Sequence, residues 1–456
     1  NEVLMAVPLF IFMGTILEKS KVAEDLLENM SKLLRHLRGG LGISVTLVGA
    51  LLAASTGIVG ATVVTMGLLS LPTMLKNGYN PKLATGVITA AGTLGQIIPP
   101  SIVLILLGDV ISNAYQQSQL KMGIFSPDTV SVGDLFAGSL FPGLLLVSLY
   151  ILYQFLKAIF DPSSTPEIII EESDLSYKEL FKTLFPPLTL IIAVLGSILT
   201  GFATPTEAAS VGAIGSILLA ANRIAKENFL TLVSALSFLA LLALNFLFDL
   251  RLNRDDLNLF ENISIILAVI VFIIFLISTA LCIYRLFLSG VLVDAARSST
   301  KITSMVFIIL IGATFFSLVF RGLGGDETIE HFLTNLPGGT FSAILIVMIS
   351  MFLLGFFLDF IEITFVVVPI VAPIILQMGI DPVWLGVMMA INLQTSFLTP
   401  PFGFALFYLR GVAPDSVRTS EIYRGVIPFI IIQMFMLILL STFPSIATWL
   451  PSYIFN

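Results

Sequence analysis

The sequence predicts an all-α polytopic membrane protein, built from two inverted repeats with re-entrant helical hairpins and broken transmembrane helices. Three observations support this: the composition, an internal repeat and polar interruptions inside apolar segments. Of 456 residues, 57% are hydrophobic and only 11% are charged, whereas soluble domains carry about 25% charged residues. The composition excludes a soluble enzyme, a nucleic-acid binder and a disordered chain, and the long apolar runs argue against a β-barrel.

Residues that could hold a metal or perform covalent chemistry are scarce. The net charge is −7, and the chain has one cysteine and two histidines. Cys282 lies in an apolar run, so neither a disulfide framework nor a cysteine metal site is expected. Two isolated histidines are too few for a histidine zinc site. We therefore expect no cofactor and no enzymatic activity.

Apolar segments define the expected membrane spans. Most are close to the roughly 20 residues that cross a bilayer, but 41–75 and 341–375 would each form a helix of about 50 Å at 1.5 Å per residue. Since the hydrocarbon core is about 30 Å thick, we interpret each as a re-entrant hairpin, and a long tilted helix is the alternative. The expected segments are 4–17, 41–75, 83–108, 135–160, 183–200, 206–222, 229–249, 262–286, 302–320, 341–375, 383–409 and 427–449.

Prolines and glycines recur in the two ends of the chain with a constant spacing. Pro72, Gly78, Pro81 and the Pro99-Pro100 pair all reappear 301 positions later. A fixed internal spacing indicates repeated architecture. The sequence therefore predicts a first repeat over 1–160, connecting scaffold helices over 161–301 and a second repeat over 302–456.

Basic residues favour opposite orientations of the two repeats. If the repeats are inverted, the connections on one side of the membrane collect ten Lys and Arg residues and those on the other side collect two. Parallel repeats would give eight and four. Basic residues concentrate in cytoplasmic loops, so inversion is favoured, with connection 18–40 in the cytoplasm. Inverted repeats with broken helices are typical of secondary transporters.

Each repeat has a polar break inside an apolar span. The first lies at Ala91–Ser101 and contains Pro99 and Pro100, and the second lies at Asn392–Pro401 and contains Pro400 and Pro401. Proline removes an amide donor and leaves carbonyl groups without helical partners. Such carbonyls, beside hydroxyl and amide oxygens, suit a small cation such as Na⁺, and the helix N-termini suit a carboxylate. A simple proline kink is the alternative.

The two hairpin tips differ in charge. The first tip, near residues 54–57, is uncharged, whereas the second, near 357–359, carries Asp359 and Glu362. Three residues of spacing put these two carboxylates on one helix face. Ionisable groups at membrane depth are costly and are candidates for function. They could bind a cation, carry a proton or pair with a base, or they could form a structural cap.

Several stretches resemble the large permease subunit of tripartite ATP-independent periplasmic (TRAP) transporters. The resemblance covers nearly the whole chain and rests on Val7–Gly14, Ala90–Ser101, Gly201–Ala209, Phe356–Pro373 and Asn392–Gly403. It implies an ion-transporter fold in the bacterial inner membrane, with a scaffold and a mobile elevator domain. It also implies Na⁺-driven import of an organic acid, a periplasmic substrate-binding protein and a small four-helix membrane subunit.

The resemblance assigns candidate site residues. It implies one sodium site at the first tip and break and another at the second tip and break, with substrate between the tips. The sodium candidates are Ser55, Thr56, Gly57, Gly92, Thr93, Asp359, Glu362, Asn392, Gln394 and Thr399. The substrate candidates are Gln96, Ser101, Thr395 and Ser396.

Two features depart from the family pattern. The family has further hydrophobic sequence before position 1, and residues 228–300 add the spans 229–249 and 262–286, for which no motif gives a role. A stand-alone sodium/dicarboxylate symporter or an ion antiporter of similar architecture remains the alternative function.

Overall fold

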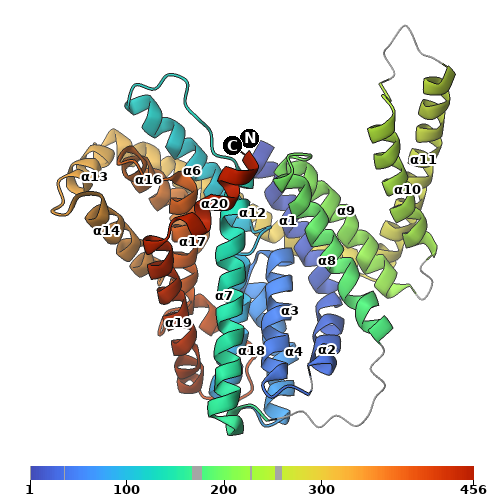
Figure 1. Cartoon of the computed structure of the whole chain (residues 1–456), viewed down its shortest axis with the longest axis horizontal. Helices are drawn as coiled ribbons and strands as arrows, with labels where there is room; N and C mark the ends of the chain where they lie inside the picture. Colours follow the sequence, from blue (N-terminus) through green and yellow to red (C-terminus); the bar gives the residue numbers. More distant parts are fainter. Residues whose placement is uncertain (1, 35, 167–176, 226–228, 252–258, 456) are drawn as a thin grey trace.

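The structure is a computed structural model that describes residues 2–34, 36–166, 177–225, 229–251 and 259–455. Over these residues the chain is helical and contains no strand (Figure 1). Seven described helices are long and apolar enough to cross a membrane, or eight if one bent pair counts as a single span. This confirms the predicted all-α polytopic class.

Two series of helices follow the same order. The first is α1 (Glu2–Lys19), α2 (Val22–Leu33), α3 (Gly40–Thr56), α4 (Val59–Lys76), α5 (Pro81–Thr93), α6 (Ile102–Lys121) and α7 (Val132–Phe160). The second is α12 (Val291–Gly322), α13 (Gly325–Thr334), α14 (Gly339–Leu354), α15 (Phe360–Glu362), α16 (Val368–Gln377), α17 (Pro382–Leu398), α18 (Phe404–Val412) and α19 (Thr419–Thr442).

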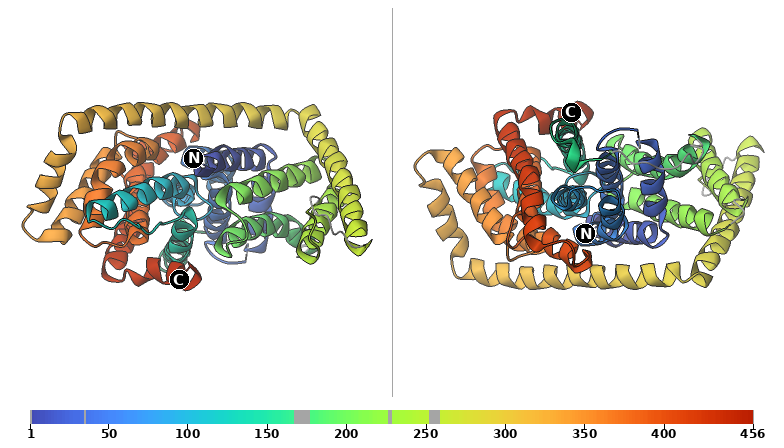
Figure 2. Two further views of the ribbon diagram at one scale, coloured as in Figure 1. Left: turned by 90° about the horizontal axis from the view of Figure 1, so that it is seen from above. Right: turned by 90° about the horizontal axis from the view of Figure 1, so that it is seen from below.

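The remaining helices connect or extend these series. They are α8 (Tyr177–Leu199), α9 (Pro205–Ile224), α10 (Phe229–Leu247), α11 (Leu259–Leu288) and α20 (Ser445–Phe455). Helices α10 and α11 stand at one end of the molecule (Figure 1). Helix α12 runs along one long side, from that end to the end formed by α13 and α14 (Figure 2).

The same local signals start corresponding helices in the two series. Gly78 and Gly379 both have positive φ, at 77° and 83°, and each precedes a helix with proline in its first turn. Asn80 caps α5 by accepting from the Lys82 amide, and Asp381 caps α17 by accepting from the Trp384 amide. Proline fits the first helical turn because the amide it lacks would have no partner there.

Packing between the series is reciprocal. Helix α4 packs against α18, and α6 packs against α16, so each hairpin contacts the second half of the other repeat's broken helix. In Figure 1 the first hairpin and α18 lie in the lower half, whereas α14, α16 and α6 lie in the upper half. The two hairpins thus enter from opposite sides, as inverted repeats require.

Both long apolar segments are interrupted where the sequence predicts. Helix α3 ends at Thr56 and α4 begins at Val59, while α14 ends at Leu354 and α15 begins at Phe360. The alternative of single tilted helices is therefore wrong. The chain also leaves the helical conformation at both Pro-Pro pairs, each of which contains a cis peptide bond.

The predicted span over 427–449 runs past the end of the helix in the structure. The sequence suggested a single segment over 427–449, but α19 ends at Thr442 and α20 begins at Ser445. Phe443 has φ −127° and ψ 72°, outside the helical region. Pro444 explains the end, because proline disfavours helical geometry in the residue before it. The predicted connections also contain helices, namely α2 within 18–40 and α13 within 321–340.

Candidate transport site

The first break lies in the protein interior. After α5, one 3₁₀ turn (Leu94–Gln96) leads to the non-helical Pro99-Pro100 pair, and every residue from 91 to 101 is buried. The Ser101 hydroxyl donates to the Gln96 carbonyl over 3.1 Å. Because the Ser101 hydroxyl is directed toward Gln96, it does not cap α6. The first backbone amides of α6 therefore donate no capping bond to the Ser101 side chain.

The tip of the first hairpin touches this break. Gly57 adopts φ +59°, and a β-carbon at this position would lie 3.0 Å from the Ile102 amide nitrogen, at the start of α6. Gly92 lies against Val63 of α4, where a β-carbon would come within 2.4 Å of the valine side chain. Glycine is needed at Gly57 because other residues rarely adopt positive φ. The first tip and the first break therefore form one site.

Two of the predicted residues at this tip are only partly described. Ser55 and Thr56 end α3, but their side chains lie outside the described part of the chain. The prediction that they bind sodium therefore stays a prediction.

The second break also has a hydroxyl that donates to a nearby backbone carbonyl. Helix α17 ends at Leu398, and the Thr399 hydroxyl donates to the Thr395 carbonyl over 2.7 Å. Ser396 donates to the Leu393 carbonyl, and a β-carbon on Gly355 would lie 2.1 Å from the Ser396 hydroxyl oxygen. Hairpin and broken helix thus meet here as well.

At the second tip the two carboxylates form a helix cap. Asp359 accepts from the Phe360 amide, and Glu362 accepts from the Asp359 amide, both over 2.7 Å. This reciprocal arrangement satisfies amides at the start of α15. The capping role that the sequence left open is therefore present. Each carboxylate has a second oxygen, so capping does not exclude contact with a cation.

Asn392 lies further back on α17. Its amide nitrogen donates to the Met348 carbonyl of α14 over 2.8 Å, so it joins the broken helix to the first arm of the second hairpin. The side-chain oxygen is the acceptor end of this amide and is the atom that a cation would use.

The two breaks meet each other at equivalent positions. Thr93 and Gln394 are 301 residues apart, the spacing of the repeat, and the Gln394 amide nitrogen donates to the Thr93 hydroxyl oxygen over 3.3 Å. Both residues are fully buried. Equivalent residues that touch must lie beside the axis that relates the two repeats. The centre of the fold is therefore the junction of the two breaks.

Several buried polar atoms around this junction have no hydrogen-bond partner within the described structure. They are both polar side-chain atoms of Gln96 and the Gln394 oxygen, and in the second hairpin the Thr364 hydroxyl is also unpaired. Buried polar groups are normally paired, since an unpaired one costs about 1–3 kcal/mol. The sequence analysis missed Thr364, which lies in a π-helical turn over Ile363–Val367. Pro369, which lacks an amide donor, is the sequence signal for that turn.

The centre has polar groups but no formal charge. Among the residues whose burial the structure describes, the buried polar side chains are Ser, Thr, Asn and Gln. The described residues also contain no cluster of three or more His, Cys, Asp or Glu that could hold a metal ion. A charged solute at this junction would therefore be balanced by helix termini or by a second ion.

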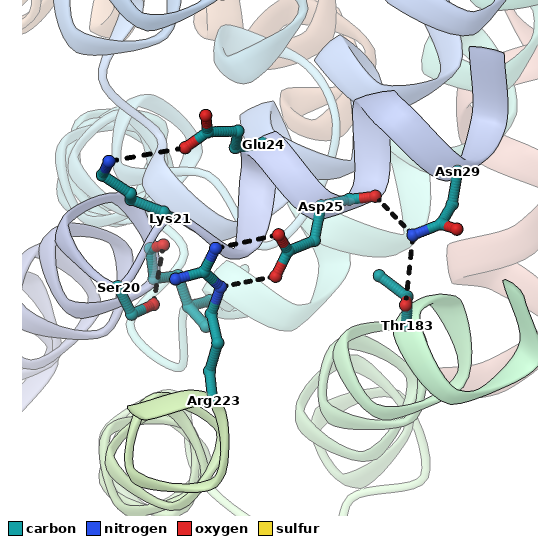
Figure 3. A network of polar contacts seen from close by, with 8 residues as sticks. Ser20, Lys21, Glu24, Asp25, Asn29, Thr183 and Arg223 are labelled. Carbon is teal, nitrogen blue, oxygen red and sulfur yellow. Dashed lines mark hydrogen bonds and ion pairs between the residues drawn. The ribbon is translucent and has the colours of Figure 1, made fainter. Parts of the chain in front are cut away.

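A polar network anchors the entry to the first hairpin. Arg223 of α9 makes a bidentate contact with Asp25 of α2, and one of its two hydrogen bonds measures 2.8 Å (Figure 3). Asn29 of α2 donates to the Thr183 hydroxyl of α8 over 3.3 Å (Figure 3). Helix α2 is thereby fixed to the connecting helices.

Comparison with known proteins agrees with this architecture. The family model described as "Tripartite ATP-independent periplasmic transporter, DctM component" matches residues 1–249 and 257–446. The match includes the whole of α10 and α11, so these two helices are not the departure from the family that the sequence suggested. A solved structure of the Alcanivorax borkumensis YdaH transporter has a TM-score of 0.51 at 13% identity, covering 99% of this chain and 86% of that chain. This second likeness concerns the fold.

Relatives extend over almost the whole chain. The C4-dicarboxylate TRAP transporter large permease protein of Vibrio cholerae is 29% identical, over 98% of this chain and 85% of its own length. The ectoine/5-hydroxyectoine permease of Ruegeria pomeroyi is 26% identical, over 99% and 87%. The sialic acid permease of Vibrio cholerae is 25% identical, over 99% and 86%. Since the family match covers nearly the whole chain, this protein belongs to the DctM family of TRAP transporter large permeases, which are membrane transporters and not enzymes.

Proposed function

We propose that this permease uses a sodium gradient, without ATP, to import a small organic acid across the bacterial inner membrane. The observation that carries the proposal is the junction at Thr93 and Gln394, where two broken helices and two hairpin tips surround buried neutral oxygens. In secondary transporters, unwound backbone at membrane depth binds ions and substrate. The relatives with C4-dicarboxylate and sialic acid in their names support an acidic solute.

Sodium would bind where each tip meets its break. At the first site the backbone carbonyls freed near Gly57 and Gly92 and the Thr93 hydroxyl are hard oxygen ligands, with Ser55 and Thr56 as further candidates. At the second site Thr399 and one oxygen each of Asp359, Glu362 and Asn392 serve the same purpose. Hard cations prefer oxygen ligands of this type. Gln394, on the axis between the breaks, is the remaining sodium candidate.

The solute would lie between the two sites. Gln96, Ser101, Thr395 and Ser396 are the candidate contacts, and the uncapped start of α6 offers backbone amides beside them. A helix N-terminus favours an anion. The buried polar side chains at the Thr93–Gln394 junction are uncharged. Sodium at the first site, which has no carboxylate among its candidate ligands, would therefore balance the carboxylate of the solute, which couples the two binding events.

Movement would follow an elevator scheme. We propose that α8–α11 form the scaffold and that the hairpins, broken helices, α7 and α19 move together across the membrane. This divides the chain as the sequence suggests, into repeats 1–160 and 302–456 around the connecting part 161–301. The transporter would work with a periplasmic substrate-binding protein and a small four-helix membrane subunit, partners that the TRAP family implies.

Uptake into proteoliposomes tests the proposal. The permease is reconstituted with its small subunit, and a radiolabelled organic acid is added with or without the binding protein and with or without an inward sodium gradient. We expect uptake only when both are present. Sodium-dependent uptake without the binding protein would instead indicate a stand-alone symporter. Equal uptake without sodium and without the binding protein would overturn the proposal.

A further inference from the structure

A groove opens on the outer side of the second repeat, and its inner end reaches Asn392 in the second broken helix. It has a volume of about 920 Å³ and lies between α14, α17 and α19. Its body is apolar and includes Phe341, Leu345, Phe352, Met388, Met434 and Ile438. The proposed transport cycle uses one lining residue, Asn392 at the inner end, and assigns no role to the rest of the groove.

Polar groups gather at one end of the groove. Thr340 lies at the start of α14, Asp381 caps the start of α17, and Ser441 and Thr442 lie at the end of α19. From Asp381 the groove reaches Asn392, a rise of about 16 Å along α17 at 1.5 Å per residue. Half of the hydrocarbon core is about 15 Å. With its polar end at the membrane surface, a groove of this length would reach the middle of the bilayer with its apolar body.

The chain itself leaves this face open. In the first repeat, α3 packs along α1, α2 and α7. In the second repeat, Phe341 and Ile349 of α14 are 72% and 49% exposed. Because the groove lies at hydrocarbon depth, its apolar body has to contact another apolar group. Its graded polarity matches an amphiphile that lies along the membrane normal, with its tail toward the middle of the bilayer.

The charge at the polar end indicates the headgroup. Asp381 is the one charged residue that lines the groove, and its exposed side chain lies at the polar end. A carboxylate there attracts an ammonium group and repels a lipid with a net negative charge. We propose that the groove binds one phospholipid of the phosphatidylethanolamine type, with an acyl chain between α14 and α19 and its ammonium group beside Asp381. This site does not depend on which solute is transported.

The two tryptophans of the chain allow a direct test. Trp384 lines the groove, is 7% exposed and donates from its ring nitrogen to the Leu440 carbonyl over 2.8 Å. Trp449 lies on α20 and is 55% exposed. In Trp449→Phe, fluorescence reports on the groove alone, and in Trp384→Phe it reports on the exposed α20 site, which serves as the matched control.

The experiment measures quenching by lipids with brominated acyl chains in proteoliposomes. For Trp449→Phe, we expect half-maximal quenching at a mole fraction of brominated phosphatidylethanolamine about threefold lower than that of brominated phosphatidylglycerol, the preference that one exposed ion pair gives. Trp384→Phe should show equal quenching by both lipids.

Two further variants, both in the Trp449→Phe background, separate headgroup from tail. Asp381→Asn keeps a residue that caps helices well and should abolish the preference between lipids while quenching persists. Met348→Phe enlarges a side chain in the groove and should reduce quenching by both lipids. Equal quenching by the two lipids before any change at Asp381 would overturn the headgroup assignment. Absence of quenching at Trp384 would show that a protein surface, from a second copy or a partner, covers the groove instead.

Discussion

The two repeats share a backbone plan but differ in what surrounds it. In the first repeat the hairpin arm α3 is enclosed by α1, α2 and α7, and its tip turns through Gly57 with positive φ. In the second repeat the arm α14 is largely exposed, and its tip is held by the carboxylates of Asp359 and Glu362. The two repeats carry the same turn residues at equivalent positions, but the side chains and helices around their hairpins differ.

The anchoring of the two connecting helices differs in the same way. Helix α2 is tied to α9 through the bidentate Asp25–Arg223 pair. Its counterpart α13 is tied to the end of the broken helix α6, through Lys121 and Glu330 at 2.8 Å. One repeat is therefore fastened to the connecting helices and the other to the broken helix.

The largest effect is expected at the first tip. Gly57→Ala should lower the sodium-driven uptake rate about tenfold or more, because positive φ costs other residues about 1–2 kcal/mol and because the new β-carbon presses on the start of α6. Gly201 also has positive φ, at 71°, but a β-carbon there would meet no atom within 4 Å. Gly201→Ala is therefore the control and should transport almost normally. An equal loss of uptake in both variants would mean that the effect comes from backbone strain at positive φ and not from the contact with α6.

The second tip allows charge and capping to be separated. Asparagine caps helices as well as aspartate does, so Asp359→Asn should keep thermal stability while raising the sodium concentration for half-maximal uptake about fivefold, equivalent to about 1 kcal/mol of ion binding. Asp134→Asn changes a carboxylate in the capping box of α7, where Asp134 accepts from the Ser131 amide, and should leave sodium dependence unchanged. Unaltered sodium dependence in Asp359→Asn would reduce that residue to a structural cap.

The hydrogen bond between Thr93 and Gln394 should be measurable as a coupling free energy. A double-mutant cycle with Thr93→Val and Gln394→Met should give an interaction free energy of unfolding of about 0.5–1.5 kcal/mol, as expected for one buried hydrogen bond. The buried pair Gln433 and Tyr150, joined over 2.8 Å between α19 and α7, provides the reference cycle. Full additivity at Thr93 and Gln394 would mean that the two breaks are not in contact.

The smallest effects are expected at the two anchors. Arg223→Gln and Glu330→Gln should each lower the free energy of unfolding by about 0.2–1 kcal/mol, the range for exposed ion pairs. The loss should be larger for Arg223→Gln, since its contact is bidentate. Thermal unfolding at low and high salt measures the loss of stability in both variants. Each loss should be smaller at high salt, because salt screens exposed ion pairs. A larger loss of unfolding free energy in Glu330→Gln than in Arg223→Gln would contradict the stronger anchoring of α2.

The positions of helix breaks were predictable, because they depend on residues with strong local preferences. The Pro-Pro pairs and Gly57 mark points where a helix ends, and the mid-segment Asp359 marks the point where α15 begins. The sequence analysis failed where a boundary depended on one proline in an apolar segment, as at Pro444. It also failed where polar connections folded into α2 and α13, since short helices at a surface are stabilised mainly by packing.

The residues of the candidate site were predictable from the sequence, but their contacts with one another were not. Nothing in the spacing revealed that Gln394 contacts Thr93, that Asn392 donates to Met348, or that Thr364 lies unpaired in a π turn. These facts depend on how helices distant in sequence approach each other. The pairing of Asp359 with Glu362 was foreseen as an option because it is local.

Sequence alone predicts that the chain lies in a membrane, that its two halves run in opposite directions, and where each half leaves the helical conformation. Those properties follow from hydropathy, from the location of charges and from the backbone limits of proline and glycine, which act within a few residues. The tertiary structure decided which oxygens and amides meet at the axis, which carboxylates are used as caps, and which face of α14 stays open. Contacts between distant helices depend on side-chain packing over the whole fold, and no local pattern encodes them.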